Sequence, residues 1–173
     1  LTVGDSSEII QQVADGTAHV GIVGAPAPLP ELVSLPYLDD ALVLTAPSRL
    51  SGSRLEDAGW QDRLVGLPWI MREQGSGTRA TLETAMARAG IDLRAIEPVL
   101  VVHSSLAVLE CVEAGLGVAA VSTLAARSYL ERGSVVALDV PGLDMRRSFY
   151  VVHHGTRYLF PALRSFLKTC GCV

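Results

Sequence analysis

Apolar and polar positions along the chain follow two different periods, which predicts an alternation of strands and helices. Residues 5–16, DSSEIIQQVADG, carry their apolar side chains on one helical face. Asp5 and Ser6 are N-cap candidates for this helix, and Gly16 stands where a C-cap belongs. The flanking runs LTVG and HVGIVG are short and apolar, so the chain is predicted to open as strand, helix, strand.

The next stretch is predicted to be irregular, because Pro26, Pro28 and Pro30 exclude regular structure there. Two short strands are expected after it, at Leu32–Leu35 and Leu42–Ala46, linked by LPYLDD. A second apolar run, LVGLPWIM, follows before the pattern changes.

From Gly77 the pattern becomes a regular α/β alternation. Helices are predicted at residues 78–89, 104–115 and 123–133 and from Pro161, with strands at 98–103, 116–122, 134–140 and 147–154. Strands that alternate with helices of about ten residues indicate right-handed βαβ units and a mainly parallel sheet, covered on both faces. The Val-rich strands fit this burial.

Two predicted strand-to-helix turns carry hydroxyl side chains. In EQGSGT, glycines free the backbone while Ser76 and Thr78 bring hydroxyls and unpaired N–H groups to a helix start; in VVHSSLAV, His103 and Ser104 stand at the same kind of junction. Parallel sheets bind ligands at such junctions, and helix N-termini favour small anions or carboxylates. Ser and Thr are also common N-caps, so the residues alone leave a capping role and a binding role open.

Other site chemistry is weak in this sequence. GSGT lacks the lysine of a nucleotide-binding P-loop and the third glycine of a dinucleotide fingerprint, so ATP and NAD are disfavoured and no cofactor is expected. No G-x-S-x-G or H-E-x-x-H motif occurs. The pair His153 and His154 is interpreted as exposed or capping, and Asp39 with Asp40 as a solvated turn. Without a nucleophile, base and oxyanion hole, we expect a binding module rather than an enzyme.

Composition narrows the function classes further. The 173 residues have a formal net charge of -4, which argues against the chain itself gripping DNA, and no apolar stretch reaches the ~18 residues of a membrane span. Cys111 is expected to be a small buried side chain, and the terminal Cys170 and Cys172 are too few to predict a metal site. We expect a reduced, cytoplasmic protein. LTVGDSSEII lacks both a signal peptide and an initiator methionine, which suggests a fragment of a larger protein.

Four segments together resemble one family. LTVGDSSEIIQQVADGTAHVGIVGAP, PWIMREQGSGTR, SSLAVLECVEAGLGVAAVS and RRSFYVVHHGTRYLFPALRSFLKT are similar, in order and spacing, to the effector-binding domain of LysR-type transcriptional regulators. The resemblance covers essentially the whole chain and is closest to members that sense small inorganic anions or small metabolites in sulfur and carbon assimilation.

The resemblance implies a type II periplasmic-binding-protein-like fold of two α/β lobes, each a mainly parallel sheet flanked by helices, joined by two crossover strands. The crossings would fall near Ile70–Arg72 and Phe149–Val152. Lobe I would comprise residues 1–70 and 150–173, and lobe II residues 71–149. Family members also have a strand and helix before the position of Leu1, preceded by a winged helix-turn-helix.

The resemblance further implies an effector in the cleft between the lobes; no metal is expected. Its position-by-position transfer expects ligand contacts at Ser76, Gly77, Thr78, His103 and Ser104, with further lining residues Gly24, Ala25 and Ser122. The expected partners are a small-molecule or inorganic-anion effector, DNA only through the missing N-terminal domain, and a homodimer or tetramer at full length, without a membrane.

Two alternatives share this fold. A solute receptor of a transport system would need a secretory signal upstream and would favour an oxidising compartment. A lyase or dehydratase would need an acid/base pair in the cleft, which the sequence does not offer.

Overall fold

The computed structural model describes residues 1–50, 59–140 and 142–172. They divide into two compact units: unit 1 is Leu1–Asp40, Gly75–Gly77 and Arg147–Val173, and unit 2 is Ala41–Gln74 and Thr78–Arg146. The chain therefore passes from one unit to the other several times, and neither unit is a continuous stretch of sequence.

In unit 1, a well-capped helix packs on a short strand. Helix α1 (Ser6–Asp15) starts with a reciprocal capping box between Asp5 and Glu8 and ends at Gly16, which has a φ of 84°. Strand β1 (Val20–Val23) pairs antiparallel with β7 (Arg146–His154). The predicted helix and the strand after it are confirmed, whereas the strand expected at LTVG was wrong, since residues 1–4 form no strand.

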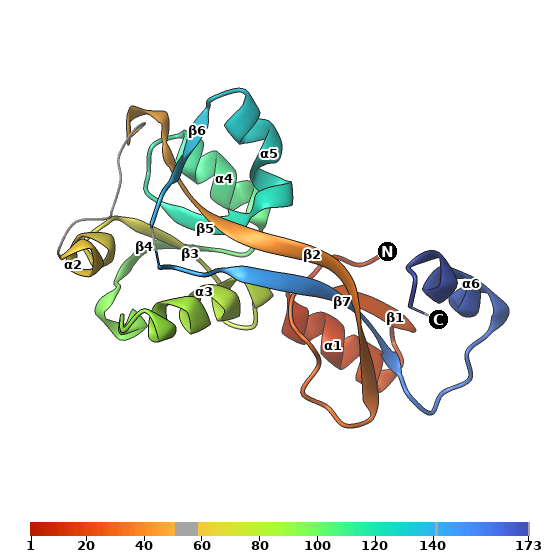
Figure 1. The fold of residues 1–173 in the computed structure, drawn as a ribbon. Helices are drawn as coiled ribbons and strands as arrows, with labels where there is room; N and C mark the ends of the chain where they lie inside the picture. The colour runs from red at the N-terminus through yellow and green to blue at the C-terminus, as the bar shows by residue number, and fades with distance from the viewer. Residues whose placement is uncertain (51–58, 141, 173) are drawn as a thin grey trace. The chain divides into compact units, whose positions relative to one another are not determined.

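Unit 1 has two small hydrophobic clusters, one on each face of β7. Val152 faces a cluster with residues of α1, whereas the adjacent Val151 packs with Leu163 and Leu167 of helix α6 (Pro161–Thr169). Successive side chains of a strand point to opposite faces, so α1 and α6 cover different sides of the sheet. Figure 1 shows the two helices on different sides of β1.

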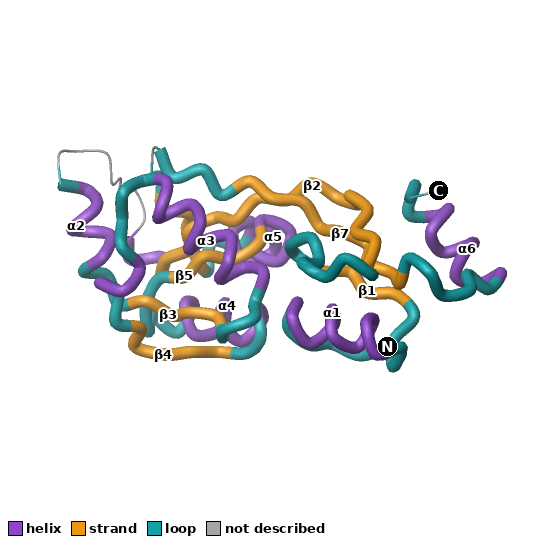
Figure 2. The backbone as a smooth tube through the Cα atoms, turned by 90° about the horizontal axis from the view of Figure 1, so that it is seen from below, coloured by secondary structure: helices purple, strands orange, loops and turns teal. Residues whose placement is uncertain are grey.

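Strand β2 (Leu32–Pro47) is one continuous strand of 16 residues. The expectation of two short strands with an irregular link at LPYLDD was wrong, because the φ of Pro36 is compatible with extended backbone and proline removes only its own N–H group. β2 and β7 are neighbours in the sheet, and both are drawn as long strands in Figure 2. The chain leaves unit 1 between Asp40 and Ala41 of β2 and re-enters it between Arg146 and Arg147 of β7.

Unit 2 combines parallel and antiparallel pairing. β3 (Trp69–Arg72) runs parallel to β4 (Pro98–Val102), and the bridge between Trp69 and Val118 places β5 (Ala119–Ser122) on its other side in the parallel direction. The second half of β2 pairs antiparallel with β5 on one side and with β6 (Val135–Leu138) on the other.

Helices cover both faces of the unit 2 sheet, with α4 and α5 on one side and α3 on the other (Figure 1). Trp69 and Met71 pack with the α3 side chains Leu82 and Met86, whereas Ile70 faces Val108 and Leu109 of α4. The helices are α2 (Trp60–Val65), α3 (Gly77–Arg88), α4 (Ser105–Glu113) and α5 (Thr123–Glu131), with 3-10 turns η1 (Ser48–Leu50) and η2 (Leu93–Ala95). α2 is a helix that the sequence pattern did not predict.

The two-lobed α/β class agrees with these two units, but some expected details differ. Parallel pairing is found among β3, β4 and β5, whereas β1 pairs antiparallel with β7, and β2 pairs antiparallel with β5 and β6. β3 itself lies in unit 2 and forms its sheet, and the chain passes into unit 1 at Gly75–Gly77, shortly after the expected crossing near Ile70–Arg72. β2 makes a further passage, at Asp40–Ala41. The last passage lies at Arg146–Arg147, just before the expected Phe149–Val152.

Candidate functional site

Three helices of unit 2 start at the same edge of its sheet. Because β4, β3 and β5 run in parallel, their carboxyl ends share an edge, and each strand leads towards a helix at that edge. Thr78 lies in the first turn of α3, Ser104 is the N-cap of α4, and Ser122 is the N-cap of α5. Hydroxyl groups and the N–H groups of three helix starts therefore collect at this edge, which suits an anionic ligand.

The Ser104 and Ser122 hydroxyls also have a structural role. Ser104 Oγ accepts a hydrogen bond from Ala107 N at 3.5 Å, and Ser122 Oγ accepts one from Leu124 N at 3.2 Å. Ser104 and His103 are exposed, whereas Thr78 and Ser122 are buried. The capping interpretation is confirmed for Ser104, and Ser122, expected only to line the ligand site, is an N-cap as well; the Ser104 hydroxyl hydrogen can still be donated to a ligand.

A buried ion pair between Arg72 and Glu73 lies at the carboxyl end of β3. Arg72 binds the adjacent Glu73 through two nitrogens of its guanidinium, with Nε–Oε2 at 2.8 Å and Nη2–Oε1 at 2.6 Å, and their side chains are only 12% and 7% exposed. Arg72 Nη1 also donates to Ser105 Oγ at 2.8 Å, in the first turn of α4. The pair thereby ties the end of β3 to the start of α4.

The charge state of Glu73 follows from the same contacts. Burial alone would raise the pKa of Glu73, but the hydrogen bonds from Arg72 and from its own backbone N–H, with the charges of Arg72 and His103, outweigh it and lower the pKa. Glu73 is thus an anion that neutralises Arg72. A ligand at this edge would meet N–H groups and hydroxyls rather than an unpaired guanidinium.

In unit 1, two glycines bring polar turns into close contact. A Cβ atom added to Gly77 would lie 2.8 Å from Ser6 Oγ and 3.1 Å from Gly24 Cα, so only glycine fits there without a shift of backbone. Gly24 N donates to Ser6 Oγ at 3.3 Å. The structure therefore brings together Gly24 and Gly77, both predicted site residues, with the start of α1.

The remaining predicted residues of unit 1 flank this contact. Ser76 is buried beside Gly77, and Ala25 is half-buried after Gly24. Ser7 Oγ donates to the carbonyl of Gly75 at 3.3 Å, and Gly75 has a φ of 91°, which favours glycine. The predicted site residues are thus divided: Gly24, Ala25, Ser76 and Gly77 lie in unit 1, and Thr78, His103, Ser104 and Ser122 lie in unit 2.

Sequence reasoning did not single out Ser6, Glu73 or Arg147 as functional candidates. Ser6 was interpreted only as a helix cap, although VGDSS is a strand-to-helix turn of the same type as the two that were singled out. Glu73 gave no signal apart from its position beside Arg72. Arg147 gave none, because its partner is 107 residues away in sequence.

The partner of Arg147 is Asp40, which corrects the interpretation of Asp39 and Asp40 as a solvated turn. Both lie in β2, and the Asp40 side chain is fully buried, with Oδ2 accepting from Arg147 Nε at 2.8 Å. Asp39 remains exposed and accepts from Ser148 Oγ at 2.9 Å. Adjacent residues of a strand point to opposite faces, so the burial of Asp40 against Arg147 leaves Asp39 on the other, exposed face.

The histidine and cysteine interpretations have mixed outcomes. His153 is buried rather than exposed, with Nδ1 3.1 Å from the carbonyl of His154, whereas His154 Nδ1 accepts from Thr156 N as a turn cap. Cys111 is partly buried against the α4–α5 side of the core. All three cysteines are free. Within the described ranges, no cluster of three or more metal-ligating side chains was found, and no helix is both long and apolar enough to cross a membrane.

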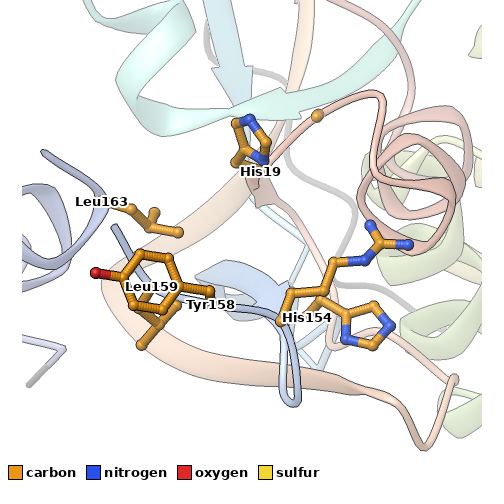
Figure 3. Close-up of a pocket in the computed structure, with 7 residues that line it drawn as sticks. His19, His154, Tyr158, Leu159 and Leu163 are labelled. Carbon is orange, nitrogen blue, oxygen red and sulfur yellow. The ribbon is translucent and has the colours of Figure 1, made fainter. Parts of the chain in front are cut away.

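Two cavities of unit 1 differ greatly in size. The smaller has a volume of about 20 Å³ and is bounded by His19, His154, Tyr158, Leu159 and Leu163, which Figure 3 shows around it. This is room for about one water molecule and is too small for a metabolite. The larger is a groove of about 620 Å³. Residues 1–4, β1 and the α1 residues Ile9 and Gln12 line it. Neither includes a predicted ligand residue.

A third depression, of about 540 Å³, lies beside α3 in unit 2. Its charged residues pair with one another, Arg79 with Glu83 and Arg94 with Asp92. Arg79 Nη1 also donates to the carbonyl of Arg72 at 3.1 Å. This depression therefore shares Arg79 with the sheet edge but holds none of the predicted ligand residues.

Comparison with known families gives a match over nearly the whole chain. The model of the family described as LysR substrate binding domain matches residues 1–172. HTH-type transcriptional regulator YeiE of Escherichia coli is 31% identical over 98% of this chain and 56% of its own length. A RuBisCO operon transcriptional regulator of Acidithiobacillus ferrooxidans is 28% identical over 97% of this chain and 53% of its own length. The chain spans about half the length of these curated relatives.

Solved structures give the same fold. The regulatory domain of CcmR from Synechocystis PCC6803, in complex with 2-PG, superposes with a TM-score of 0.80 at 24% identity, over 96% of this chain and 78% of that one. The effector binding domain of QuiR in complex with shikimate gives 0.81 at 18% identity, over 96% and 77%. At these identities the likeness establishes the fold alone.

Proposed function

The chain belongs to the LysR substrate binding domain family, and from this premise we propose that it is the effector-sensing part of a DNA-binding transcriptional regulator and that its effector is a small anion or carboxylate. One observation carries the proposal: three helices with hydroxyl-bearing first turns or N-caps start at the carboxyl edge of three parallel strands in unit 2. Positive helix ends and N–H groups favour a negative ligand group there.

The ligand chemistry follows from the neutralised Arg72. Since Glu73 accepts from Arg72 Nε and Nη2 and Ser105 Oγ accepts from Nη1, the edge offers hydrogen-bond donors of modest charge. Such donors suit an anion with several oxygen atoms, and hydroxyl groups of the same ligand can be bound by the same set. The 2-PG and shikimate complexes of structural neighbours are consistent with this ligand class.

The regulatory part of the proposal concerns the full-length protein. Relatives about twice as long as this chain carry names of transcriptional regulators, and we propose that effector binding here changes how the rest of such a protein binds DNA. With a net charge of -4, this chain alone is expected to bind duplex DNA poorly. Tight, salt-sensitive binding of duplex DNA by the isolated chain would contradict that expectation.

The first experiment is a thermal-shift panel of sulfate, phosphate, shikimate and small carboxylates, since a ligand that binds only the folded state raises its stability. Titration calorimetry with any active compound then tests the edge. Thr78→Ala is expected to weaken binding by about 1.5–3 kcal/mol, the range of a lost hydrogen bond to a charged group. Thr84→Ala is the control on the same helix, because Thr84 Oγ1 bonds only its own helix, at the carbonyl of Ala80.

A second variant separates binding from capping. Ser104→Asp retains an N-cap, so stability is expected to be preserved, but the added charge should repel an anion. Unchanged affinity in both Thr78→Ala and Ser104→Asp would place the ligand elsewhere. Gly24→Ala and Ser76→Ala form a separate arm that tests the unit 1 residues.

A further inference from the structure

The two strands by which the chain leaves and re-enters unit 1 carry opposite charges that face each other. Asp40 is the last residue of unit 1 in β2, and Arg147 is its first residue in β7. Their side chains are 0% and 7% exposed, and Arg147 Nε donates to Asp40 Oδ2 at 2.8 Å. A buried, charge-assisted hydrogen bond therefore joins the two connecting strands at their unit 1 ends.

Arg147 also packs against the turn after β1. A Cβ atom added to Gly24 would lie 3.0 Å from Arg147 Nη1 and 3.6 Å from Gly77 Cα. Gly24 is held in turn by its N–H bond to Ser6 Oγ. The guanidinium thus lies between the connecting strands and the polar turn of unit 1.

The orientation of the guanidinium is fixed on its own strand as well. The Arg147 Cζ atom lies 4.7 Å from the centre of the Phe149 ring. Arg147 therefore contacts three segments: β2 through Asp40, β7 through Phe149, and the Gly24 turn. The planar guanidinium makes such contacts directional, unlike an aliphatic side chain of similar volume.

Stability alone does not explain a charged pair here. Desolvation of two buried ions can exceed their attraction, and apolar replacements of similar volume are often as stable. What the ion pair adds is a defined geometry between its partners. This feature suggests a role in positioning.

We propose that Asp40 and Arg147 are positioning residues that couple the Gly24 turn to the two connecting strands. A change in the turn is transmitted through the guanidinium to both strands, and a change in the strands is transmitted back to the turn, as coupling between sites must be reciprocal. The use of this coupling in signalling rests on the proposed effector function. The coupling itself is a property of the unliganded chain.

The test is therefore amide hydrogen exchange by NMR without a ligand, so that a failure of the proposed effector function does not affect it. Asp40→Asn is expected to speed exchange at Gly24 and at residues 39–41 and 147–149 by about tenfold, while α6 of the same unit keeps its exchange rates. The control is Asp144→Asn, which removes a neighbouring but exposed ion pair, Asp144 with Arg146 at 2.7 Å. It should leave Gly24 unchanged.

Two further variants keep the test decisive. If Asp40→Asn does not fold because the buried Arg147 loses this carboxylate, Asp40→Leu with Arg147→Met removes both charges at similar volume and should fold with the same faster exchange at Gly24. Ser6→Ala tests the reverse direction and should speed exchange at 39–41 and 147–149. Faster exchange confined to the mutated strands, or a uniform increase that includes α6, would overturn the coupling.

Discussion

In unit 2 the central strand β3 is buried between helices, whereas in unit 1 the edge strand β1 is partly exposed. Trp69, Ile70 and Met71 of β3 are each at most 3% exposed, with helices packed on both faces. In β1 of unit 1, Ile22 is 48% exposed, beside the groove that residues 1–4 border. Apolar burial is the main favourable contribution to folding, so stability is distributed unequally, and local opening is expected to begin in unit 1.

The largest expected effect tests this contrast directly. Trp69→Ala removes a fully buried side chain and its hydrogen bond from Nε1 to the carbonyl of Leu64 at 2.8 Å, and should lower the free energy of unfolding by about 3–5 kcal/mol. Ile22→Ala, in unit 1, should cost less than about 1 kcal/mol because nearly half of Ile22 is already in water. Urea unfolding followed by circular dichroism gives both values, and similar losses would refute the contrast.

A second prediction compares how closely each unit packs around a glycine. A Cβ at Gly117 in unit 2 would lie 2.2 Å from the backbone carbonyl oxygen of Pro68, whereas one at Gly21 in unit 1 would meet the Ile9 side chain at 2.4 Å. Backbone cannot give way as a side chain can, so Gly117→Ala should cost about 1–3 kcal/mol and Gly21→Ala less.

The control for these glycine variants is Gly66→Ala. Gly66 has a φ of -75° and no atom closer than 3.4 Å to an added Cβ, so alanine should be neutral or slightly stabilising. The same urea experiment measures all three. A larger loss for Gly21→Ala than for Gly117→Ala would show that unit 1 is the more rigid.

The smallest expected effect concerns the ion pair of unit 2. The pKa of Glu73 is lower in the folded chain than its usual 4.5, so its ionised form contributes stability above that pH, which is lost as the pH falls through the folded value. Glu73→Gln should cost about 1–2 kcal/mol near pH 7, and the difference from the unchanged chain should shrink below about pH 4.5.

Urea midpoints at a series of pH values measure that difference. Asp144→Asn is the comparison for Glu73→Gln, because Arg146 holds the pKa of Asp144 at about 2 although this side chain is exposed. Its effect on the midpoint should be smaller, since solvent screens the exposed pair. A pH-independent loss in Glu73→Gln would mean that its packing, not its charge, matters.

Local chemistry explains which elements the sequence could predict. The caps at Asp5, Ser104 and Ser122 and the glycine at 16 mark helix ends through bonds to residues no more than four positions away. Periodic apolar positions then identify the strands between them. The polar turn at Ser104 was predictable for the same reason.

Contacts between distant segments explain what the sequence could not predict. Asp40 looks like one of two solvated carboxylates until β7 brings Arg147 against it, and nothing near Arg147 in sequence indicates that partner. The contact of Gly24 with Gly77 is also non-local, although both glycines were recognised by resemblance. The continuity of β2 was missed because Pro36 was taken as a break, whereas the neighbouring strands decide whether the chain stays extended.

The unbroken β2 strand has a consequence for how related sequences can diverge. From Asp40 to Leu44 its buried and partly exposed side chains alternate, and its register with β5 and β6 is set at Leu44. Loss or gain of a single residue between Ser34 and Asp40 would turn Asp40 away from Arg147 or shift the whole register in unit 2. Relatives that keep both contacts should therefore vary in length in the proline-rich loop at residues 25–31, while the length of this strand stays constant through their evolution.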